Sequence, residues 1–517
     1  MPNPLWDALF APLAARTAPL LTLRDGTVIT GAAFLAIVAQ QAHALRAAGV
    51  RPGDRIAAQV PKSPQALAAW GAAVGLGAVF LPLNTAYTDA ELDYFLADAA
   101  PRVLLADPAR ALDRLAARHG AALLTLDAAG CGTLADAAAQ QPATIAAADR
   151  ATDDLAALLY TSGTTGRSKG AMLTQGNLLS NALALVDVWR MSGRDVLIHA
   201  LPIFHTHGLF VATNSILASG GRMILLPGFD AAEVVGLLPQ ATMLMGVPTF
   251  YTRMLDQPGL AAAARDMRLF ISGSAPLLPE THRSFARITG HSIVERYGMT
   301  ETSMIASNPV AGERRAGTVG FPLPGVELRL DAQPVGGIEV RGGNVFPGYW
   351  QMPDKTAAEF TADGWFRTGD IGRFDADGYL SIVGRAKDMV ITGGFNVYPV
   401  EVEAALDAVP GVLESAVIGL PHPDLGEAVF AVLVARPGAD LDAGAVLAAV
   451  RDSLARFKQP RAAVVADALP RNAMGKVQKA ALRAAHADRF AKAGAAAATA
   501  EAAGPITPAP GSRRAPR

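Results

Sequence analysis

Short apolar runs alternate with longer helical patterns in the first part of the chain, and this alternation is the feature that most restricts the possible folds. The apolar runs are 55–60, 78–83 and 103–106, and the helical patterns are 31–48 and 63–76. Strands that alternate with helices form mostly parallel sheets covered by helices on their faces. The same pattern returns within 243–272. We therefore predict an α/β fold in which layered subdomains form one large domain, residues 1–386.

The sequence pattern changes after residue 386. A strand-like run at 389–391 is followed by an acidic helical pattern at 399–409 and by an alternating run from Val412. These elements predict a small α+β domain, residues 387–490. Residues 491–517 are rich in Ala, Pro and Arg and show almost no periodicity, so we predict a disordered tail.

Bulk properties exclude several classes of protein. A chain of 517 residues exceeds the size at which one hydrophobic core keeps growing. A net charge of -1 gives no field that attracts nucleic acid, and no run reaches the roughly eighteen apolar residues of a membrane span. The single cysteine, Cys131, cannot form an internal disulfide. We expect a cytoplasmic enzyme that binds neither nucleic acid nor a membrane.

Residues 161–170, TSGTTGRSKG, form the strongest single motif. Their glycines let the backbone bend around a ligand, their hydroxyls can donate hydrogen bonds, and Arg167 and Lys169 carry positive charge, which is the chemistry of a phosphate loop. It is not a Walker loop, because Ser168 rather than glycine precedes Lys169. Composition alone equally allows a flexible linker. The motifs that follow decide against the linker.

Six further motifs follow in a fixed order, at 272–276, 297–301, 368–370, 384–388, 393–399 and 470–476. Together with 161–170 they resemble the adenylate-forming superfamily, which includes acyl-CoA synthetases, luciferases and nonribosomal peptide adenylation domains. The resemblance implies a large N-terminal adenylate-forming domain and a small mobile C-terminal domain. It also implies ATP and coenzyme A (CoA) as co-substrates and Mg²⁺ as cofactor.

The resemblance assigns ATP binding to a set of residues from these motifs: Thr161, Ser162, Gly163, Thr164, Thr165, Gly166, Lys169, Gly273, Ser274, Ala275, Tyr297, Gly298, Met299, Thr300, Asp370 and Arg385. Tyr297 would stack on adenine, with 273–275 as the opposite wall. Asp370 would accept the ribose hydroxyls, although it could also be a turn residue. Glu301 would be the magnesium ligand and, with Thr165, part of the catalytic set.

The second domain carries three further roles by resemblance. Lys476 would bridge the carboxylate and the α-phosphate as the catalytic cation, and a lysine acetyltransferase acting on it is an expected partner. Lys387 would be the hinge, and Gly393 and Gly394 would admit CoA. The alternatives are a surface lysine for Lys476 and a plain interdomain linker at Lys387.

The acid substrate is inferred from two arginines. The segment 204–208 contains His205 and His207, which we expect to form the pocket wall rather than a metal site, because no third ligand is near. Arg253 and Arg296 fall where an acyl pocket is expected, and a buried arginine is costly unless a carboxylate pairs with it. Residues 196–301 are similar to the malonyl-CoA synthetases. The alternative, in which Arg253 points outward to solvent, stays open.

The expected reaction is the ATP-dependent ligation of malonate, or of methylmalonate, to CoA through an acyl-adenylate, with release of AMP and pyrophosphate. The expected small-molecule partners are therefore a small dicarboxylic acid, ATP and CoA. Two alternatives remain: a CoA ligase for a short or medium monocarboxylic acid, and a non-catalytic protein that binds acyl-adenylates.

Overall fold

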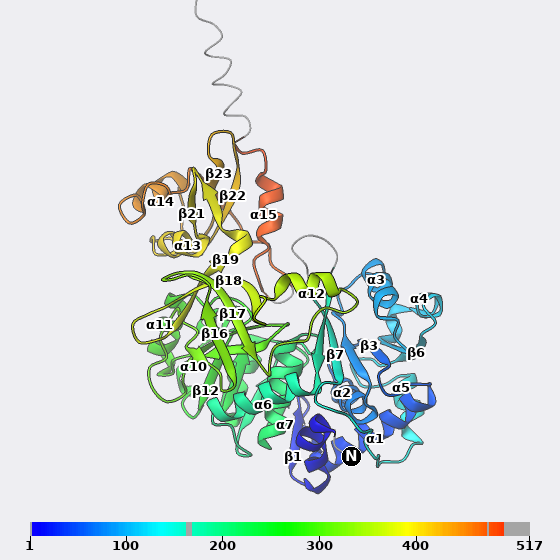
Figure 1. The fold of residues 1–517 in the computed structure, drawn as a ribbon. Coiled ribbons are helices and arrows are strands. Elements are labelled where there is room, and N and C mark those ends of the chain that lie inside the picture. Colours follow the sequence, from blue (N-terminus) through cyan, green and yellow to red (C-terminus); the bar gives the residue numbers. More distant parts are fainter. Residues whose placement is uncertain (1–2, 162–167, 473–474, 491–517) are drawn as a thin grey trace, which may run out of the picture. The chain divides into compact units, whose positions relative to one another are not determined.

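The computed structural model describes residues 3–161, 168–472 and 475–490, and it divides into two compact units (Figure 1). The first unit runs to Thr368 and includes Gly372–Ile382, and the second consists of Gly369–Ile371 and the chain from Val383 onward. The predicted boundary at 386/387 lies close to Val383 and stays a prediction. The predicted tail, 491–517, lies outside the described residues. No helix in the described part of the chain is long and apolar enough to cross a membrane.

The first sheet of the first unit has six strands in the order β6-β5-β3-β4-β7-β8. Its strands are β3 (Arg55–Gln59), β4 (Val79–Pro82), β5 (Val103–Ala106), β6 (Ala122–Thr125), β7 (Leu155–Thr161) and β8 (Lys169–Thr174). All pair in parallel except β7 and β8, which are antiparallel. The α/β layers predicted from the alternation are therefore confirmed.

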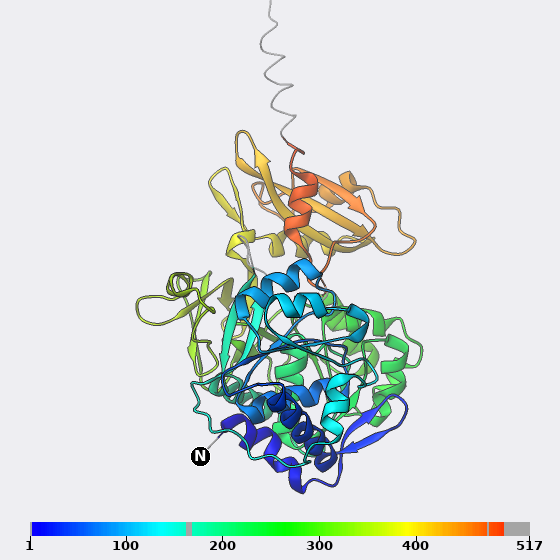
Figure 2. The same cartoon turned by 90° about the vertical axis from the view of Figure 1, so that its right-hand side faces the viewer.

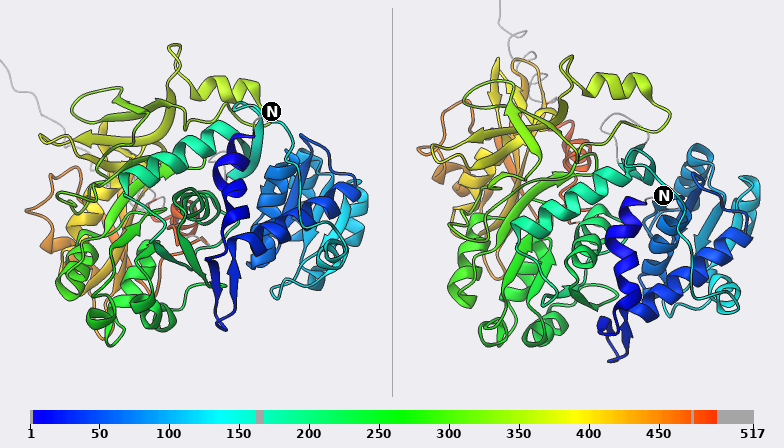
Figure 3. Two further views of the ribbon diagram at one scale, coloured as in Figure 1. Left: turned by 90° about the horizontal axis from the view of Figure 1, so that it is seen from below. Right: turned by 60° about the horizontal axis from the view of Figure 1, so that its bottom comes forward.

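Helices cover both faces of this sheet. The helices are α1 (Gly31–Ala47), α2 (Pro64–Leu76), α3 (Asp89–Ala99), α4 (Asp113–Arg118) and α5 (Thr133–Ala139), with short turns η1 (Trp6–Phe10), η2 (Ala11–Ala15) and η3 (Pro108–Arg110). Helices α1 and α2 lie side by side (Figure 3). Leu96 of α3 and Leu115 of α4 belong to one buried cluster with Leu81 and Leu104 of the strands.

Helix α2 shows how local sequence sets the bounds of an element. The Ser63 side chain accepts a hydrogen bond from the Ala66 amide at the helix start, and Pro64 occupies the first turn, where its missing N–H costs nothing. The helix ends at Gly77, which adopts φ 64°, a left-handed conformation that suits glycine. Both ends of the predicted helix at 63–76 are thus confirmed.

The second sheet has nine strands in the order β15-β14-β13-β12-β11-β9-β10-β1-β2. Its strands are β1 (Pro19–Leu23), β2 (Val28–Thr30), β9 (Val196–His199), β10 (Arg222–Leu225), β11 (Met243–Gly246), β12 (Leu269–Ser272), β13 (Val294–Met299), β14 (Ser303–Ser307) and β15 (Phe321–Pro322). The strands from β1 to β13 in this order pair in parallel, so their carboxyl ends lie at one edge of the sheet. Most of the candidate site is built at that edge.

The remaining helices of the first unit are α6 (Gln175–Val188), η4 (His207–Thr213), α7 (Asn214–Ser219), α8 (Ala231–Leu237), η5 (Leu238–Gln240), α9 (Pro248–Leu255), α10 (Leu260–Ala263), α11 (Pro279–Thr289) and α12 (Pro353–Glu359). A third sheet has the order β16-β17-β18-β19, with β16 (Val326–Leu330), β17 (Gly336–Gly342), β18 (Phe366–Phe374) and β19 (Leu380–Arg385).

The second unit is an α+β structure, as predicted. Its sheet has the order β21-β20-β23-β22, and β24 also pairs with β23. Its elements are η6 (Ala386–Asp388), β20 (Val390–Thr392), β21 (Phe395–Val397), α13 (Pro399–Asp407), β22 (Val412–His422), β23 (Gly426–Ala435), α14 (Ala443–Ala449), β24 (Ala462–Ala466) and α15 (Lys479–His486). Side chains of β22 alternate between the two faces. Val417 packs in the cluster with Val402 of α13, and Ile418 packs with Leu482 of α15, which lies across β22 (Figure 2).

Candidate active site

The ends of β12 and β13 bring the expected adenine-binding residues together. The two strands are parallel neighbours with Ser272 opposite Glu295, so 273–275 follow β12 beside Tyr297 of β13. Tyr297 is buried, and Ser274 has φ 69°, which is unusual for a residue with a side chain. Gly298 lies at an irregularity between β13 and β14, where a β-carbon would come within 2.0 Å of the Ser303 carbonyl oxygen. Met299 ends β13, and Thr300 follows it in the turn before β14.

The Glu301 carboxylate lies buried among hydroxyl groups. Tyr349 donates to its Oε1 at 3.0 Å, and Thr161 donates to the same oxygen at 3.5 Å. Burial and the neighbouring Glu301 raise the pKa of Tyr349, so this hydroxyl stays protonated as a donor. Nothing in the sequence spacing connects residue 349 with residue 301, and Tyr349 was not among the predicted site residues.

Part of the phosphate motif can be located. Thr161 ends β7 and Lys169 begins β8, so the motif connects two antiparallel neighbours. The Lys169 ammonium lies over the Tyr349 ring, 4.1 Å from its centroid. Ser162, Gly163, Thr164, Thr165 and Gly166 lie outside the described residues, and their ATP-binding roles stay predictions.

Arg296 is the most unusual charged residue of the site. It is only 5% exposed, and burial lowers its pKa to about 9. Within the described chain, its Nε and Nη2 atoms have no hydrogen-bond partner. Orphaned guanidinium nitrogens are costly in a protein interior. The site is therefore suited to an anion that would pair with them.

Two histidines line the same region, and one of them is held as a neutral ring. His207 is buried, its Nδ1 lies 3.1 Å from Ser274 Oγ, and its Nε2 has no partner among the described residues. Burial and the charge of Arg296 lower the pKa of His207 well below its usual value. His205 adjoins it, and its Nδ1 accepts a hydrogen bond from the His207 amide at 3.2 Å. The described residues contain no group of three or more His, Cys, Asp or Glu side chains that could hold a metal.

A lysine-histidine pair that the sequence did not indicate supports this segment. Lys62 Nζ lies 2.8 Å from His199 Nδ1 and donates to the carbonyls of His199 and Leu201 at 2.6 and 2.8 Å. His199 Nε2 lies 3.0 Å from the Gly208 carbonyl, so this nitrogen carries the proton. The pair ties the turn that carries His205 and His207 to the end of β9.

The structure corrects the burial argument for Arg253. Phe250, Tyr251 and Met254 of α9 are buried, but Arg253 is exposed, as in the outward-pointing alternative. The cost of a buried charge therefore applies to Arg296 and not to Arg253. A role of Arg253 as a second carboxylate ligand stays a prediction.

In the second unit, Asp370 and Arg385 form an ion pair. Arg385 Nε lies 2.7 Å from Asp370 Oδ1, and the Asp370 side chain is 4% exposed. Desolvation of its ammonium group and the positive charge of Arg385 lower the pKa of Lys476 to about 8. Desolvation also lowers the pKa of Lys387, which lies in η6. These predicted residues thus lie in one electrostatic environment, while the roles assigned to them stay predictions.

Gly393 and Gly394 form the two-residue turn between β20 and β21, with φ of 56° and 82°. Positive φ at both positions is the geometry of a tight hairpin turn, which favours glycine. The turn alone accounts for both glycines, so contact with CoA stays a prediction.

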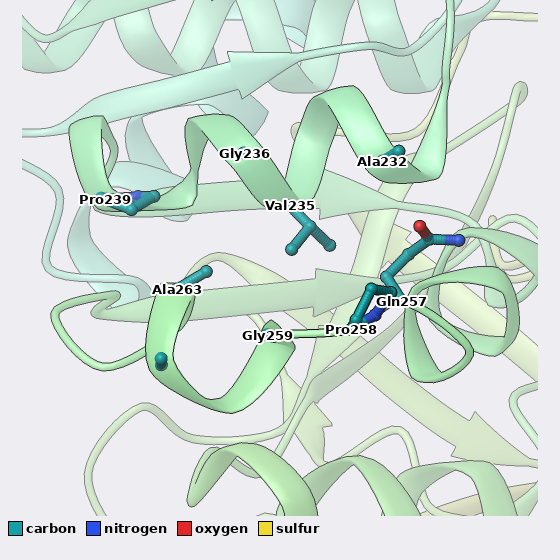
Figure 4. A pocket seen from close by; sticks show the side chains of 9 residues that line it. Ala232, Val235, Gly236, Pro239, Gln257, Pro258, Gly259 and Ala263 are labelled. Carbon is teal, nitrogen blue, oxygen red and sulfur yellow. The ribbon is translucent and has the colours of Figure 1, made fainter.

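The cavity drawn in Figure 4 is separate from these residues. It has a volume of about 530 Å³ and is lined by α8, η5, α10 and the segment 257–259 before α10, mainly by Val235, Pro239, Pro258 and alanines. Gln257 is its longest polar side chain. A lining without a titratable group offers no acid-base or phosphate chemistry.

Comparison with known proteins finds two family models that match the chain. A family model described as AMP-binding enzyme matches residues 13–350, and a model of the AMP-binding enzyme C-terminal domain matches residues 401–476. The crystal structure of ATP-bound MatB from Rhodopseudomonas palustris superposes with a TM-score of 0.93 at 52% identity, covering 95% of this chain and all of the other.

Two curated relatives differ in their acids. A feruloyl-CoA synthase of Amycolatopsis sp. is 38% identical over 484 residues, which cover 91% of this chain and 96% of the relative. A malonate–CoA ligase of Arabidopsis thaliana is 36% identical over 444 residues, which cover 78% and 73%. The relatives thus share ligation to CoA and diverge in the acid.

Proposed function

The chain belongs to the AMP-binding enzyme family and is an AMP-forming acyl-CoA ligase, and we propose that its acid substrate is malonate, with methylmalonate as a second substrate. One observation carries the choice of acid. Arg296 is buried beside the residues expected to bind the nucleotide, and two of its nitrogens are unpaired within the described chain. A second carboxylate on the substrate would satisfy both.

A monocarboxylic acid such as ferulate fits this site poorly. Its apolar end would displace any water from Arg296 and leave the guanidinium buried and unpaired, which costs several kcal/mol by order of magnitude. The neutral ring of His207 adds no negative charge that could compensate. A CoA ligase for a monocarboxylic acid is therefore the second candidate.

The ligation of malonate to CoA proceeds in two steps. A carboxylate oxygen of malonate attacks the α-phosphorus of ATP, a bond forms between them, and the α–β phosphoanhydride bond breaks to release pyrophosphate. The thiolate sulfur of CoA then attacks the acyl carbonyl, and AMP leaves with the electron pair of the acyl–oxygen bond. We assign adenine stacking to Tyr297 and the ribose hydroxyls to Asp370.

Negative charge accumulates in the first step, and the chain's cations would neutralise it. Lys476 would hold the attacking carboxylate against the α-phosphate, and Lys169 and Thr165 would contact the other phosphate oxygens. Gly393 and Gly394 would admit the CoA thiol in the second step. Acetylation of Lys476 by a lysine acetyltransferase would remove its charge and stop adenylation; a deacetylase that restores no activity to an acetylated sample would contradict this.

The residues around Glu301 fit a magnesium ion. A buried carboxylate held by two hydroxyls is the hard oxygen ligand that Mg²⁺ prefers, and phosphates and water complete such a site. Glu301 would hold the ion, which when bound neutralises phosphate charge.

The test is CoA-dependent formation of AMP with a panel of acids: malonate, methylmalonate, octanoate and ferulate. The proposal predicts the highest kcat/KM for malonate. A higher value for octanoate or ferulate would replace malonate with a monocarboxylate. Binding of an acyl-adenylate without AMP formation from any acid would favour a non-catalytic protein.

A further inference from the structure

Tyr349 contacts two groups of opposite charge, and both are expected to act in nucleotide binding. It is 4% exposed, and its hydroxyl donates to Glu301 Oε1 at 3.0 Å. The Lys169 ammonium lies on its ring face, 4.1 Å from the centroid. One side chain therefore fixes the positions of a carboxylate and an ammonium group at the same time.

Backbone pairing builds this arrangement. Tyr349 lies opposite Ala171 in an antiparallel bridge, with the Trp350 amide donating to the Gly170 carbonyl at 2.7 Å and the Met172 amide to the Gly348 carbonyl at 3.1 Å. Residues two apart in a strand share a face, so Lys169 lies on the same side as Ala171, next to the tyrosine ring. The placement follows from the strand that leaves the phosphate motif.

The Lys169 ammonium also has a carboxylate nearby. Glu359 Oε1 of α12 lies 3.6 Å from Lys169 Nζ but only 2.9 Å from Lys355 Nζ, which is its neighbour on the same helix. The pairing of Lys169 with Glu359 is thus the longer of the two. A partly desolvated ammonium is also attracted to the face of a tyrosine ring, so the Tyr349 ring is a second contact that holds Lys169 in place.

We propose that Tyr349 is a positioning residue for ATP and its magnesium ion: its hydroxyl orients the Glu301 carboxylate toward the metal, and its ring presents the Lys169 ammonium to the phosphates. This inference rests on the nucleotide site of the proposed function. Tyr349 would then set the distance between Glu301, the metal ligand, and Lys169, the phosphate-binding cation.

Two variants separate the two contacts. Tyr349→Phe removes the hydroxyl and keeps the ring, whereas Tyr349→Leu removes both. Binding of α,β-methylene-ATP, which does not react, is measured by calorimetry in EDTA and at increasing Mg²⁺. In Tyr349→Phe, binding in EDTA should equal the wild type, and the gain in affinity from Mg²⁺ should be roughly tenfold smaller, the loss expected for one hydrogen bond to a charged group.

Tyr349→Leu should lose that gain and also bind roughly fivefold more weakly in EDTA, because Lys169 has lost its ring. Should this variant fail to fold, Tyr349→Phe still decides, since it keeps the ring that packs against Phe346.

Tyr379 offers a matched control in the same unit. Its hydroxyl donates to the Glu313 carbonyl at 2.9 Å, and the Arg315 guanidinium lies 4.2 Å from its ring centroid. Tyr379→Phe therefore removes a hydrogen-bonded hydroxyl from another cation-bearing ring, here one that donates to a backbone carbonyl, and the nucleotide affinity and its Mg²⁺ dependence should not change.

The outcomes distinguish the inference from the function on which it rests. A wild-type protein that binds no analogue with Mg²⁺ would overturn the nucleotide site itself. Wild-type binding that depends on Mg²⁺, with the same dependence in Tyr349→Phe, would overturn the positioning role alone. An equal loss in Tyr379→Phe would likewise overturn it, because the effect would then not be specific to Tyr349.

Discussion

The Arg296 guanidinium packs directly against the Cα of Gly273. A β-carbon at residue 273 would lie 2.3 Å from Arg296 Cζ, far inside any real contact. The strand register explains the contact, because Ser272 lies opposite Glu295 and the following residues are therefore neighbours. The glycine that the motif assigns to the adenine wall is thus also the residue that makes room for the buried cation.

Gly273→Ala should therefore displace Arg296 and weaken binding of the acid more than binding of the nucleotide. We expect the KM for malonate to rise roughly tenfold or more, by analogy with the cost of overpacking, which is about 1–3 kcal/mol. Steady-state kinetics with each substrate varied would measure this. Gly236→Ala is the control, because nothing lies within 4 Å of the added carbon and the residue is in α8. Equal effects on both KM values would contradict the prediction.

The two arginines should differ in their effect on malonate. Removing one partner of a desolvated charge pair costs about 2–5 kcal/mol, so Arg296→Gln should raise the KM for malonate at least roughly thirtyfold. Arg253 is exposed, and solvent screening limits an ion pair there to about 1 kcal/mol, so Arg253→Ala should raise it about fivefold at most. A larger effect at Arg253 than at Arg296 would reverse the assignment of the main carboxylate ligand.

The rate of adenylation should fall at high pH because Lys476 loses its charge. Its pKa of about 8 lies below that of an ordinary lysine, and the protonated form is the one proposed to act. The groups around it are Arg385, Lys387, Asp370 and Asp388. The rate of malonate-dependent pyrophosphate release should therefore fall as the pH rises through about 8. In Lys476→Arg the charge persists, so the fall should disappear even where the rate is lower. A wild-type rate that holds constant to pH 9.5 would remove this explanation.

Glu295 should make the folded protein less stable at high pH. Burial raises its pKa to about 8, and its Oε1 accepts a hydrogen bond from the Gly317 amide at 3.1 Å. The carboxyl of the unfolded chain has its ordinary pKa of 4.5 and ionises above it, whereas the folded one stays protonated up to about 8, so stability is lost between these pH values as the pH rises. Glu295→Gln keeps the acceptor and has no charge. Its unfolding temperature should match the wild type at pH 5 and exceed it by about 2–5 °C at pH 8.5; equal values at both pH values would show that Glu295 is already ionised.

Local sequence predicted the elements whose limits are set by local chemistry. The helix at 63–76 carries its own cap residues, and the strand at 103–106 is an apolar run that matches β5 residue for residue. The motifs indicated the family because each is a short stretch of sequence and they follow one another in a fixed order. Long-range contacts gave no such signal. The contact between Tyr349 and Glu301, and that between Lys62 and His199, join segments that only the sheets bring together.

Burial of the arginines was the least predictable feature. Two adjacent charged residues, Glu295 and Arg296, usually indicate an exposed side of a strand, but β13 lies inside a sheet covered on both faces, so both are buried. Arg253 lies in a short helix next to buried residues. Which way its side chain points depends on which face of this helix packs against the core. Sequence could name both arginines and could not tell which one is desolvated.

The buried guanidinium of Arg296 should bind a second negative charge on the acid, and comparison of malonate with its half-amide, malonamate, tests this binding most directly. The two acids have nearly the same shape, and only malonate carries the distal charge. In the wild type, kcat/KM for CoA-dependent AMP formation should be at least roughly thirtyfold higher with malonate than with malonamate, and in Arg296→Gln the ratio of the two values should be close to one. Equal rates with both acids in the wild type would contradict it.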